Sequence, residues 1–231
     1  MEQRTEEWFA ARLGKVTASK VADVMARTKT GYSTSRENYM AQLICERMTG
    51  QKQESYTNAA MEWGTETEPL ARAAYEAFKD VLVDEVGIID HPFIPMSAAS
   101  PDGLISDDGM VEIKCPNTAT HIDTLLSQTV PSKYNTQMQW QMACTGRKWC
   151  DFVSFDNRLP DHLQLFVARV KRDEAYIAEL EQEVSKFIKE LDATVEFFKN
   201  GAKVTDVNVQ ITTSDGVVHD INHADKITWH G

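Results

Sequence analysis

The N-terminal part of the chain has apolar residues at the spacing of helices. Four segments show this period and predict helices: residues 5–12, 17–26, 35–49 and 57–78. Gly50 follows the third segment, at a place where glycine commonly ends a helix. Pro69 lies inside the fourth and marks either a break or a fresh first turn. The polar residues 27–34 predict a mobile loop between two of these helices.

The middle of the chain changes to the alternating pattern of strands. Six segments predict strands: residues 80–90, 93–99, 103–106, 110–115, 149–156 and 162–170. Asp107-Asp108-Gly109 is a favourable turn between two of them and predicts a hairpin. Three further segments return to helical spacing: 118–128, 132–144 and a long one from Asp173 to about residue 199. The sequence therefore predicts an α/β fold in which helices flank a central mixed β-sheet.

The chain is expected to form one main domain. No repeat, low-complexity tract or linker divides residues 1–202. Residues 203–231 return to strand-like alternation around Ser214-Asp215-Gly216. We expect this segment to be an appendage, either an extra hairpin or a tail that binds a partner.

Composition and charge narrow the class of protein. Hydrophobic residues make up 42% of the 231 residues and charged residues 26%, which is typical of a globular protein with a real core. The net charge of −11 argues against a protein that coats nucleic acid by charge alone, although a local basic groove remains compatible with it. The chain has no apolar run of about 18 residues, no signal-peptide pattern and four cysteines without a CxxC motif. We therefore expect a cytosolic, reducing location.

The stretch of residues 100–116 carries the clearest chemistry. Side chains alternate along a strand, so Glu112 and Lys114 share one face while Ile113 points to the other, into the core. The predicted hairpin can bring Asp102 beside Glu112. Two carboxylates with a backbone carbonyl suit Mg²⁺ or Mn²⁺, and a neighbouring lysine can hold or activate water and stabilise charge on phosphate. This combination meets the needs of phosphodiester hydrolysis.

An ordinary surface strand explains part of the same pattern. Asp-Gly turns and alternating Glu-x-Lys are common on exposed hairpins, so these residue types alone do not decide between a surface and a site. The apolar Val111 and Ile113 on either side of Glu112 favour a site, because a surface strand would more often keep one face polar.

Four collinear motifs between about residues 5 and 170 resemble those of the phage lambda-type exonucleases of the viral recombinase, or alkaline exonuclease, family. The pair SPDG (100–103) and VEIKCP (111–116) resembles the core of the PD-(D/E)xK nuclease superfamily. The other three motifs match the family in the same order: WFAARLG (8–14) with TAS (17–19), WGTETE (63–68) and YNTQMQ (134–139). The resemblance implies a restriction-endonuclease-like α/β core with a central mixed sheet.

The resemblance also implies a metal-dependent catalytic site. It assigns the metal ligands as Asp102, Glu112 and the carbonyl oxygen of Ile113. They would bind two Mg²⁺ ions, which Mn²⁺ can replace. Lys114 would position or activate the attacking water, Glu68 would complete the acidic cluster, and Gln137 would hold the substrate or the nucleophile. Without the family, Glu68 is more readily a surface glutamate of a glutamate-rich helix, and Gln137 shares a polar helix face with Gln139 and Gln141.

The family further implies a pocket for a 5′-terminal phosphate, formed by Arg12, Ser19 and Ser100. Arginine presents a forked donor that matches phosphate, and hydroxyls add short hydrogen bonds. Ser19 is expected in the first turn of a helix, where backbone N–H groups favour an anion. A surface arginine and a helix-capping serine explain these residues equally well without the family. For Met61 we expect a methionine of the helix core rather than a wedge against the terminal base pair.

Together these implications describe an exonuclease that degrades the 5′-phosphorylated strand of duplex DNA and leaves a 3′ overhang for phage-type recombination. The family also implies a homotrimer that forms a ring around DNA, and a single-strand annealing protein as partner. Seven basic residues are candidates for the DNA path: Arg27, Lys29, Arg36, Lys52, Lys133, Arg147 and Lys148. A phage or prophage protein of this kind would act in the cytoplasm of a bacterial host.

Two alternatives stay open. The first is an endonuclease or single-strand nuclease on the same core, which would differ from an exonuclease in cutting closed circular DNA. The second is a non-catalytic DNA-binding or adaptor protein that keeps a nuclease fold. Asp102, Glu112 and Lys114 together argue against this second alternative, and Mg²⁺ binding would separate the two classes.

Overall fold

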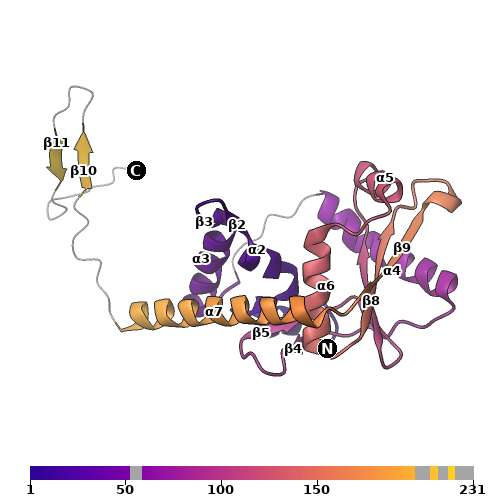
Figure 1. Ribbon diagram of the computed structural model, residues 1–231, viewed down its shortest axis with the longest axis horizontal. Helices are drawn as coiled ribbons and strands as arrows, with labels where there is room; N and C mark the ends of the chain where they lie inside the picture. The colour runs from indigo at the N-terminus through magenta and orange to yellow at the C-terminus, as the bar shows by residue number, and fades with distance from the viewer. Residues whose placement is uncertain (53–58, 201–208, 213–217, 222–231) are drawn as a thin grey trace. The chain divides into compact units, whose positions relative to one another are not determined.

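A computed structural model describes residues 1–52, 59–200, 209–212 and 218–221 of the chain (Figure 1). The chain divides into two compact units, residues 1–195 and 196–231, and each is described by itself. The expectation of one nuclease domain over residues 1–202 followed by an appendage stays a prediction. Residues 57–58, where the fourth helix was expected to begin, lie outside the described part of the chain.

The N-terminal elements are mainly helical. They follow in this order: α1 (Glu6–Arg12), β1 (Val16–Thr17), the 3₁₀ helix η1 (Ala18–Lys20), α2 (Val21–Met25), β2 (Arg27–Thr28), β3 (Gly31–Tyr32), α3 (Thr34–Thr49) and α4 (Ala59–Lys79). The Thr5 hydroxyl caps α1 by accepting the N–H of Trp8. Gly50 ends α3 in the left-handed conformation, as the sequence predicts. α4 continues through Pro69 without a break.

The expected loop over residues 27–34 contains a short antiparallel hairpin made of β2 and β3, so this prediction is wrong. The Tyr32 hydroxyl donates a hydrogen bond of 2.9 Å to Glu183, and Arg27 forms an ion pair of 2.9 Å with the same carboxylate. Glu183 lies on a helix about 150 residues later in the chain. Because the ordering contacts come from so far away, the local polarity of the segment could not reveal them.

The second half alternates strands and helices. The elements are β4 (Ile89–Asp90), β5 (Ser97–Ala99), β6 (Gly103–Ile105), β7 (Gly109–Lys114), α5 (Thr118–Ser127), α6 (Ser132–Thr145), β8 (Trp149–Phe155), η2 (Asp161–Leu163), β9 (Leu165–Lys171) and α7 (Glu174–Lys199). The strands expected over 80–90 and 93–99 are much shorter than predicted. The helix expected over 17–26 also begins later, because residues 16–17 pair as a parallel strand with residues 97–98.

The main sheet has four strands in the order β6-β7-β8-β9. The neighbours β6–β7 and β8–β9 are antiparallel, whereas β7–β8 are parallel, with Glu112 opposite Phe152 and Lys114 opposite Ser154. A three-stranded sheet in the order β1-β5-β4 is also mixed. The predicted mixed α/β sheet flanked by helices is therefore confirmed.

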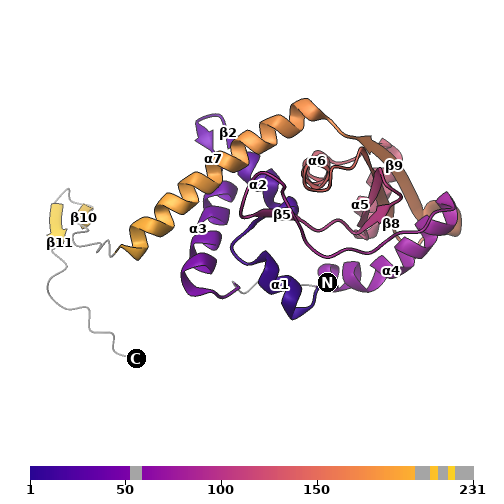
Figure 2. The same ribbon diagram turned by 90° about the horizontal axis from the view of Figure 1, so that it is seen from below.

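Both faces of the main sheet are covered by helices, and in Figure 2 its strands lie between α4 and α6. On one face, Ala71 and Tyr75 of α4 join Ile113 in a buried cluster. On the other face, Met138 and Met142 of α6 join a cluster with strand residues of β7 and β8. Successive side chains of β7 therefore enter two different interiors, and a polar side chain on this strand is buried unless it lies near the strand end.

Residues beyond α7 are described only in part. β10 (Val209–Thr212) and β11 (Val218–Ile221) pair as antiparallel strands. The turn expected at Ser214-Asp215-Gly216 lies outside the described residues. Within the described ranges, no helix combines the length and the apolar character needed to span a membrane.

Candidate active site

The hairpin of β6 and β7 places Asp102 beside Ile113, near the end of β7. Asp102 directly precedes β6, whose first residue Gly103 pairs with Val111. One oxygen of the Asp102 carboxylate, Oδ2, accepts the backbone N–H of Ile113 at 2.7 Å. Gly103 itself packs closely against Val83, because a Cβ atom built there would lie 2.0 Å from a methyl carbon of Val83. Packing therefore explains the glycine of the SPDG motif.

Glu112 is almost completely buried, with 1% of its surface exposed, and its carboxylate faces α6. The side-chain amide of Gln137 donates to Oε1 at 2.6 Å, and the amide of Gln141 donates to Oε2 at 2.6 Å. The ammonium group of Lys114 also contacts Oε1. These three donors orient the carboxylate, and about one of its roughly four lone-pair positions is left for a further ligand.

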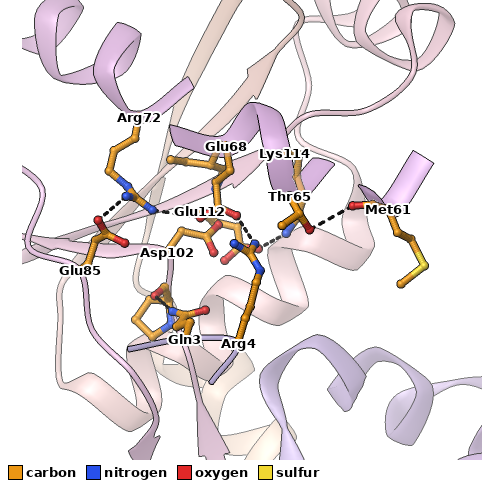
Figure 3. Close-up of polar contacts among 12 residues, drawn as sticks. Gln3, Arg4, Met61, Thr65, Glu68, Arg72, Glu85, Asp102, Glu112 and Lys114 are labelled. Atoms are coloured by element: carbon orange, nitrogen blue, oxygen red, sulfur yellow. Dashed lines mark hydrogen bonds and ion pairs between the residues drawn. The ribbon is translucent and has the colours of Figure 1, made fainter. Parts of the chain in front are cut away.

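Glu68 reaches the same site from α4 (Figure 3). Arg72, one turn later on α4, donates to Glu68 Oε1 at 3.0 Å. The guanidinium group of Arg4 contacts Oε2 of the same carboxylate. The side chain of Glu68 is only 13% exposed, so it is not the ordinary surface glutamate that the sequence allowed.

The carboxylates perturb one another. Burial, together with the charge of Glu112, raises the pKa of Asp102 to about 8, and Glu68 adds to the rise. For Lys114, burial alone would lower the pKa, but the charges of Glu112 and Asp102 outweigh it and raise the pKa well above its ordinary value. Lys114 is therefore an ammonium ion at neutral pH. Ionisation of Asp102 is opposed by burial and by the negative charges of Glu112 and Glu68. A divalent cation between the carboxylates would remove this conflict.

The donor set fits Mg²⁺. The described residues contain no group of three or more histidine, cysteine, aspartate or glutamate side chains close enough to hold a metal. Asp102 and Glu112, which interact electrostatically, offer two carboxylates, and a main-chain carbonyl with water would complete the shell. Mg²⁺ is bound in this way in many proteins, through one or two carboxylates and several waters. The carbonyl of Ile113 as the third ligand stays a prediction, while its side chain is buried in the core as expected.

The residues of the expected phosphate pocket are brought together in part. Arg12 Nη1 donates to Ser100 Oγ at 3.1 Å, and the Trp8 indole N–H donates to the same hydroxyl at 3.1 Å. The Arg12 guanidinium lies over the Trp8 ring, 4.2 Å from its centroid. No carboxylate forms an ion pair with Arg12 among the described residues, and burial lowers its pKa. An under-solvated arginine without a carboxylate partner is well suited to an anion.

Ser19 lines the same cavity as Arg12, but no hydrogen bond joins it to Arg12 or Ser100 in the described part of the chain. It lies in the three-residue helix η1, which leads directly into α2, and its expected role in binding an anion stays a prediction. Met61 was expected in the helix core, which is wrong. It is 50% exposed, and it lines both the Arg12 cavity and the cavity that holds Lys114.

The role of the seven basic residues proposed for the DNA path stays a prediction, and three of them differ clearly in their surroundings. Arg36 is buried and pairs with Glu190 at 2.7 Å. The guanidinium of Arg27 is held by its own ion pair, as described for the hairpin. Lys52 lies over the Phe9 ring and lines the Arg12 cavity. Lys52 is thus the member of this set that lies beside the expected phosphate pocket.

Sequence reasoning missed three residues that contact Glu112 or Glu68, namely Gln141, Arg72 and Arg4. Gln141 lies four positions after Gln137 on α6, and this helical spacing was the signal that both amides face one carboxylate. Arg4 precedes the first motif and carries no sequence signal, because only the fold brings it to Glu68. The second glutamine of the YNTQMQ motif, Gln139, has a different task. Its amide donates to the Lys171 carbonyl and accepts the N–H of Asp173, which ties α6 to the start of α7.

Comparisons with known proteins point in one direction. A family model described as a YqaJ-like viral recombinase domain matches residues 7–148. The crystal structure of an alkaline exonuclease, LHK-Exo, from Laribacter hongkongensis is 59% identical, with 86% of this chain and 98% of that chain covered and a TM-score of 0.81. LHK-Exo in complex with dAMP is 60% identical, with the same coverage and TM-score. A phage-related exonuclease from Haemophilus somnus 129PT shares the fold at 16% identity, with a TM-score of 0.67 over 80% of this chain and 96% of that one. No curated protein matches the chain.

Proposed function

Because the chain belongs to the YqaJ-like viral recombinase family, we propose that it is a Mg²⁺-dependent exonuclease that degrades one strand of duplex DNA in the 5′→3′ direction. Its restriction-endonuclease-like fold is that of the solved alkaline exonuclease, to which it is 60% identical. The observation that carries the proposal is the group of Asp102, Glu112 and Lys114 at the β6–β7 hairpin. The product would be duplex DNA with a 3′ overhang, a substrate for recombination by strand annealing.

The proposed mechanism assigns each side chain one task. Asp102 and Glu112 would hold Mg²⁺, with Mn²⁺ as a substitute and two ions in the full site. When bound, the metal would supply Lewis acidity, which polarises the phosphate and lowers the pKa of water. Lys114, as an ammonium ion, donates hydrogen bonds to the attacking water or the phosphate and stabilises the developing negative charge. Gln137 and Gln141 hold Glu112 in place throughout.

Each round of cleavage produces a new 5′-phosphate, the group that the protein is proposed to recognise. Water adds to phosphorus, the P–O3′ bond breaks, and a nucleoside 5′-monophosphate leaves after its 3′ oxygen takes up a proton. The remaining strand then begins with a new 5′-phosphate. We propose that Arg12 and its hydrogen-bond partner Ser100 receive this group, with Ser19 on the wall of the cavity that Arg12 lines. A ring-shaped homotrimer around DNA and a single-strand annealing protein as partner complete the proposal.

A cleavage assay with labelled substrates tests the proposal. Linear duplexes with 5′-phosphate or 5′-hydroxyl ends and a covalently closed circle are each incubated with Mg²⁺ and then with EDTA. Loss of the 5′-phosphorylated strand with an intact circle, stopped by EDTA, is the expected result. Cutting of the circle would make the protein an endonuclease. If the protein cuts none of these substrates but binds DNA without Mg²⁺, the result would favour a non-catalytic binding protein.

Arg12→Ala is expected to remove the preference for a 5′-phosphorylated end. Loss of charge-assisted hydrogen bonds to phosphate reduces kcat/KM by roughly 10- to 100-fold on the phosphorylated duplex, and far less on the 5′-hydroxyl duplex. The measurement is the ratio of the two kcat/KM values in the variant and in the wild type. Ser19→Ala, which removes a hydroxyl from the same cavity, provides the comparison. An unchanged ratio in Arg12→Ala would refute the pocket.

Mg²⁺ affinity is expected to rise with pH. A carboxyl group must lose its proton to bind the metal, and the pKa of Asp102 is raised to about 8 in the metal-free protein. Below that pH, binding therefore releases a proton, and the association constant increases by up to about tenfold per pH unit before it levels off above pH 8. Calorimetry in buffers of different ionisation enthalpy counts the released protons. A constant affinity between roughly pH 6 and pH 9 would contradict this assignment.

A further inference from the structure

Arg4 lies in the candidate active site, and no role assigned so far uses it. Its guanidinium group contacts Glu68 and lines the same cavity as Lys114. Figure 3 shows the side chain reaching from the N-terminal segment toward the group that contains Asp102 and Glu112. With 46% of the side chain exposed, Arg4 is open to a molecule that enters this cavity.

The N-terminal segment is fixed in a way that presents Arg4 to the site. The side-chain amide of Gln3 donates to the carbonyl oxygens of Val86 and Pro101, both at 2.8 Å. Pro101 directly precedes Asp102, so the same loop carries a proposed metal ligand and the anchor for Arg4. The backbone of Arg4 has a φ of 68°, in the left-handed region that residues with a Cβ atom seldom adopt. Such a conformation persists only where the surroundings impose it.

Glu68 has two arginine partners, one on each carboxylate oxygen. Arg72 forms an ion pair with Oε1 at 3.0 Å, is shared with Glu85, and lies on the inner side, since its side chain is only 14% exposed. Arg4 contacts the other oxygen from the open side of the cavity. A guanidinium group carries five N–H donors in a fixed fork, and Arg4 has a single hydrogen bond among the described residues. Most of its donors are therefore available to a ligand.

We propose that Arg4 binds a phosphate group of the DNA strand that is being cut, at the scissile bond or next to it. This inference rests on the proposed function. The forked guanidinium matches two oxygens of one phosphate, and the cavity shared with Lys114 places both cations along the same strand. Glu68 fixes the position of the guanidinium group, and Gln3 fixes the backbone of the N-terminal segment.

A chemical double-mutant cycle tests this contact. Duplexes that carry a single neutral methylphosphonate, moved one position at a time from the 5′ end, are bound to wild type and to Arg4→Ala in Ca²⁺, which replaces Mg²⁺ to slow cleavage. Fluorescence anisotropy gives Kd. Arg4→Ala is expected to weaken binding of unmodified DNA by roughly 10- to 100-fold. At one position, the methylphosphonate should reduce wild-type affinity by the same factor and remove the difference between the two proteins.

Two further variants separate a phosphate contact from general charge. Lys189→Ala removes an exposed positive charge on α7 and should keep the full methylphosphonate effect. Arg4→Lys keeps the charge without the fork and should fall between wild type and Arg4→Ala. Equal losses at every methylphosphonate position, or no loss in Arg4→Ala, would overturn the proposal. Because the cycle measures binding, a wild-type protein without exonuclease activity in Mg²⁺ would refute the proposed function separately.

Discussion

Replacing Asp102 with asparagine is expected to abolish Mg²⁺-dependent cleavage and, at the same time, to stabilise the metal-free protein. Loss of a metal ligand should reduce the rate by more than about 10³-fold, since a single well-placed electrostatic group alone contributes roughly 10²–10³. The stability effect follows from the raised pKa. In the unfolded chain this carboxyl ionises near its ordinary value, whereas in the fold burial and Glu112 oppose ionisation up to about pH 8. Folding stability therefore falls as pH rises through this window.

Asparagine removes that cost and can still accept the N–H of Ile113. Thermal unfolding in EDTA at about pH 8 should show a higher Tm for Asp102→Asn than for wild type, and added Mg²⁺ should raise the Tm of wild type only. Asp107→Asn is the matched control, because Asp107 is exposed in the turn of the same hairpin. It should leave both cleavage and Mg²⁺ stabilisation unchanged. A Tm gain from Mg²⁺ in Asp102→Asn would exclude Asp102 as a ligand.

Lys114→Ala is expected to separate metal binding from catalysis. The ammonium group contacts Glu112 and competes there with a bound cation, so the alanine variant should bind Mg²⁺ at least as tightly as wild type. Its kcat should nevertheless fall by roughly 10²–10³-fold, because the charge that stabilises the transition state is gone. Calorimetry with Mg²⁺ and single-turnover cleavage measure the two effects independently.

Lys171→Ala on β9 controls for the loss of one strand lysine, since its side chain is exposed and it lies on a strand that does not adjoin β7. Wild-type kcat is expected for this control. Lys114→Arg keeps the positive charge and should recover part of the lost rate. If Lys114→Ala cleaves at the wild-type rate, the lysine has no catalytic task. If it loses Mg²⁺ binding instead, its role is to maintain the shape of the site.

The helices were largely predictable because their apolar residues recur every three or four positions along the chain. The apolar spacing over residues 173–199 predicted α7, and Gly50 marked the end of α3. Short strands were less predictable. β1 has two residues and exists because it pairs with β5, about 80 positions later, so no local alternation could announce it. The hairpin at residues 27–34 depends in the same way on Glu183 of α7.

In the candidate site, too, residues placed by local contacts were predictable and residues placed by distant contacts were not. Asp102, Glu112 and Lys114 lie on one hairpin, and strand alternation with a tight turn was enough to place their side chains together. Gln137 and Glu68 entered through the family resemblance, and contacts within the fold give each a partner in the site. Whether each residue has its assigned catalytic role stays a prediction.

The sequence by itself determined the fold class, the order of the helices and the hairpin that carries the acidic pair, because these features depend on contacts between near neighbours in the chain. The tertiary structure alone decided the surroundings of that pair. It buried Glu112 under two amides of α6, set Arg72 and Arg4 on Glu68, and moved Met61 from an expected core to an open surface. Burial and charge at a site depend on every element that packs around it, and those elements come from distant parts of the chain.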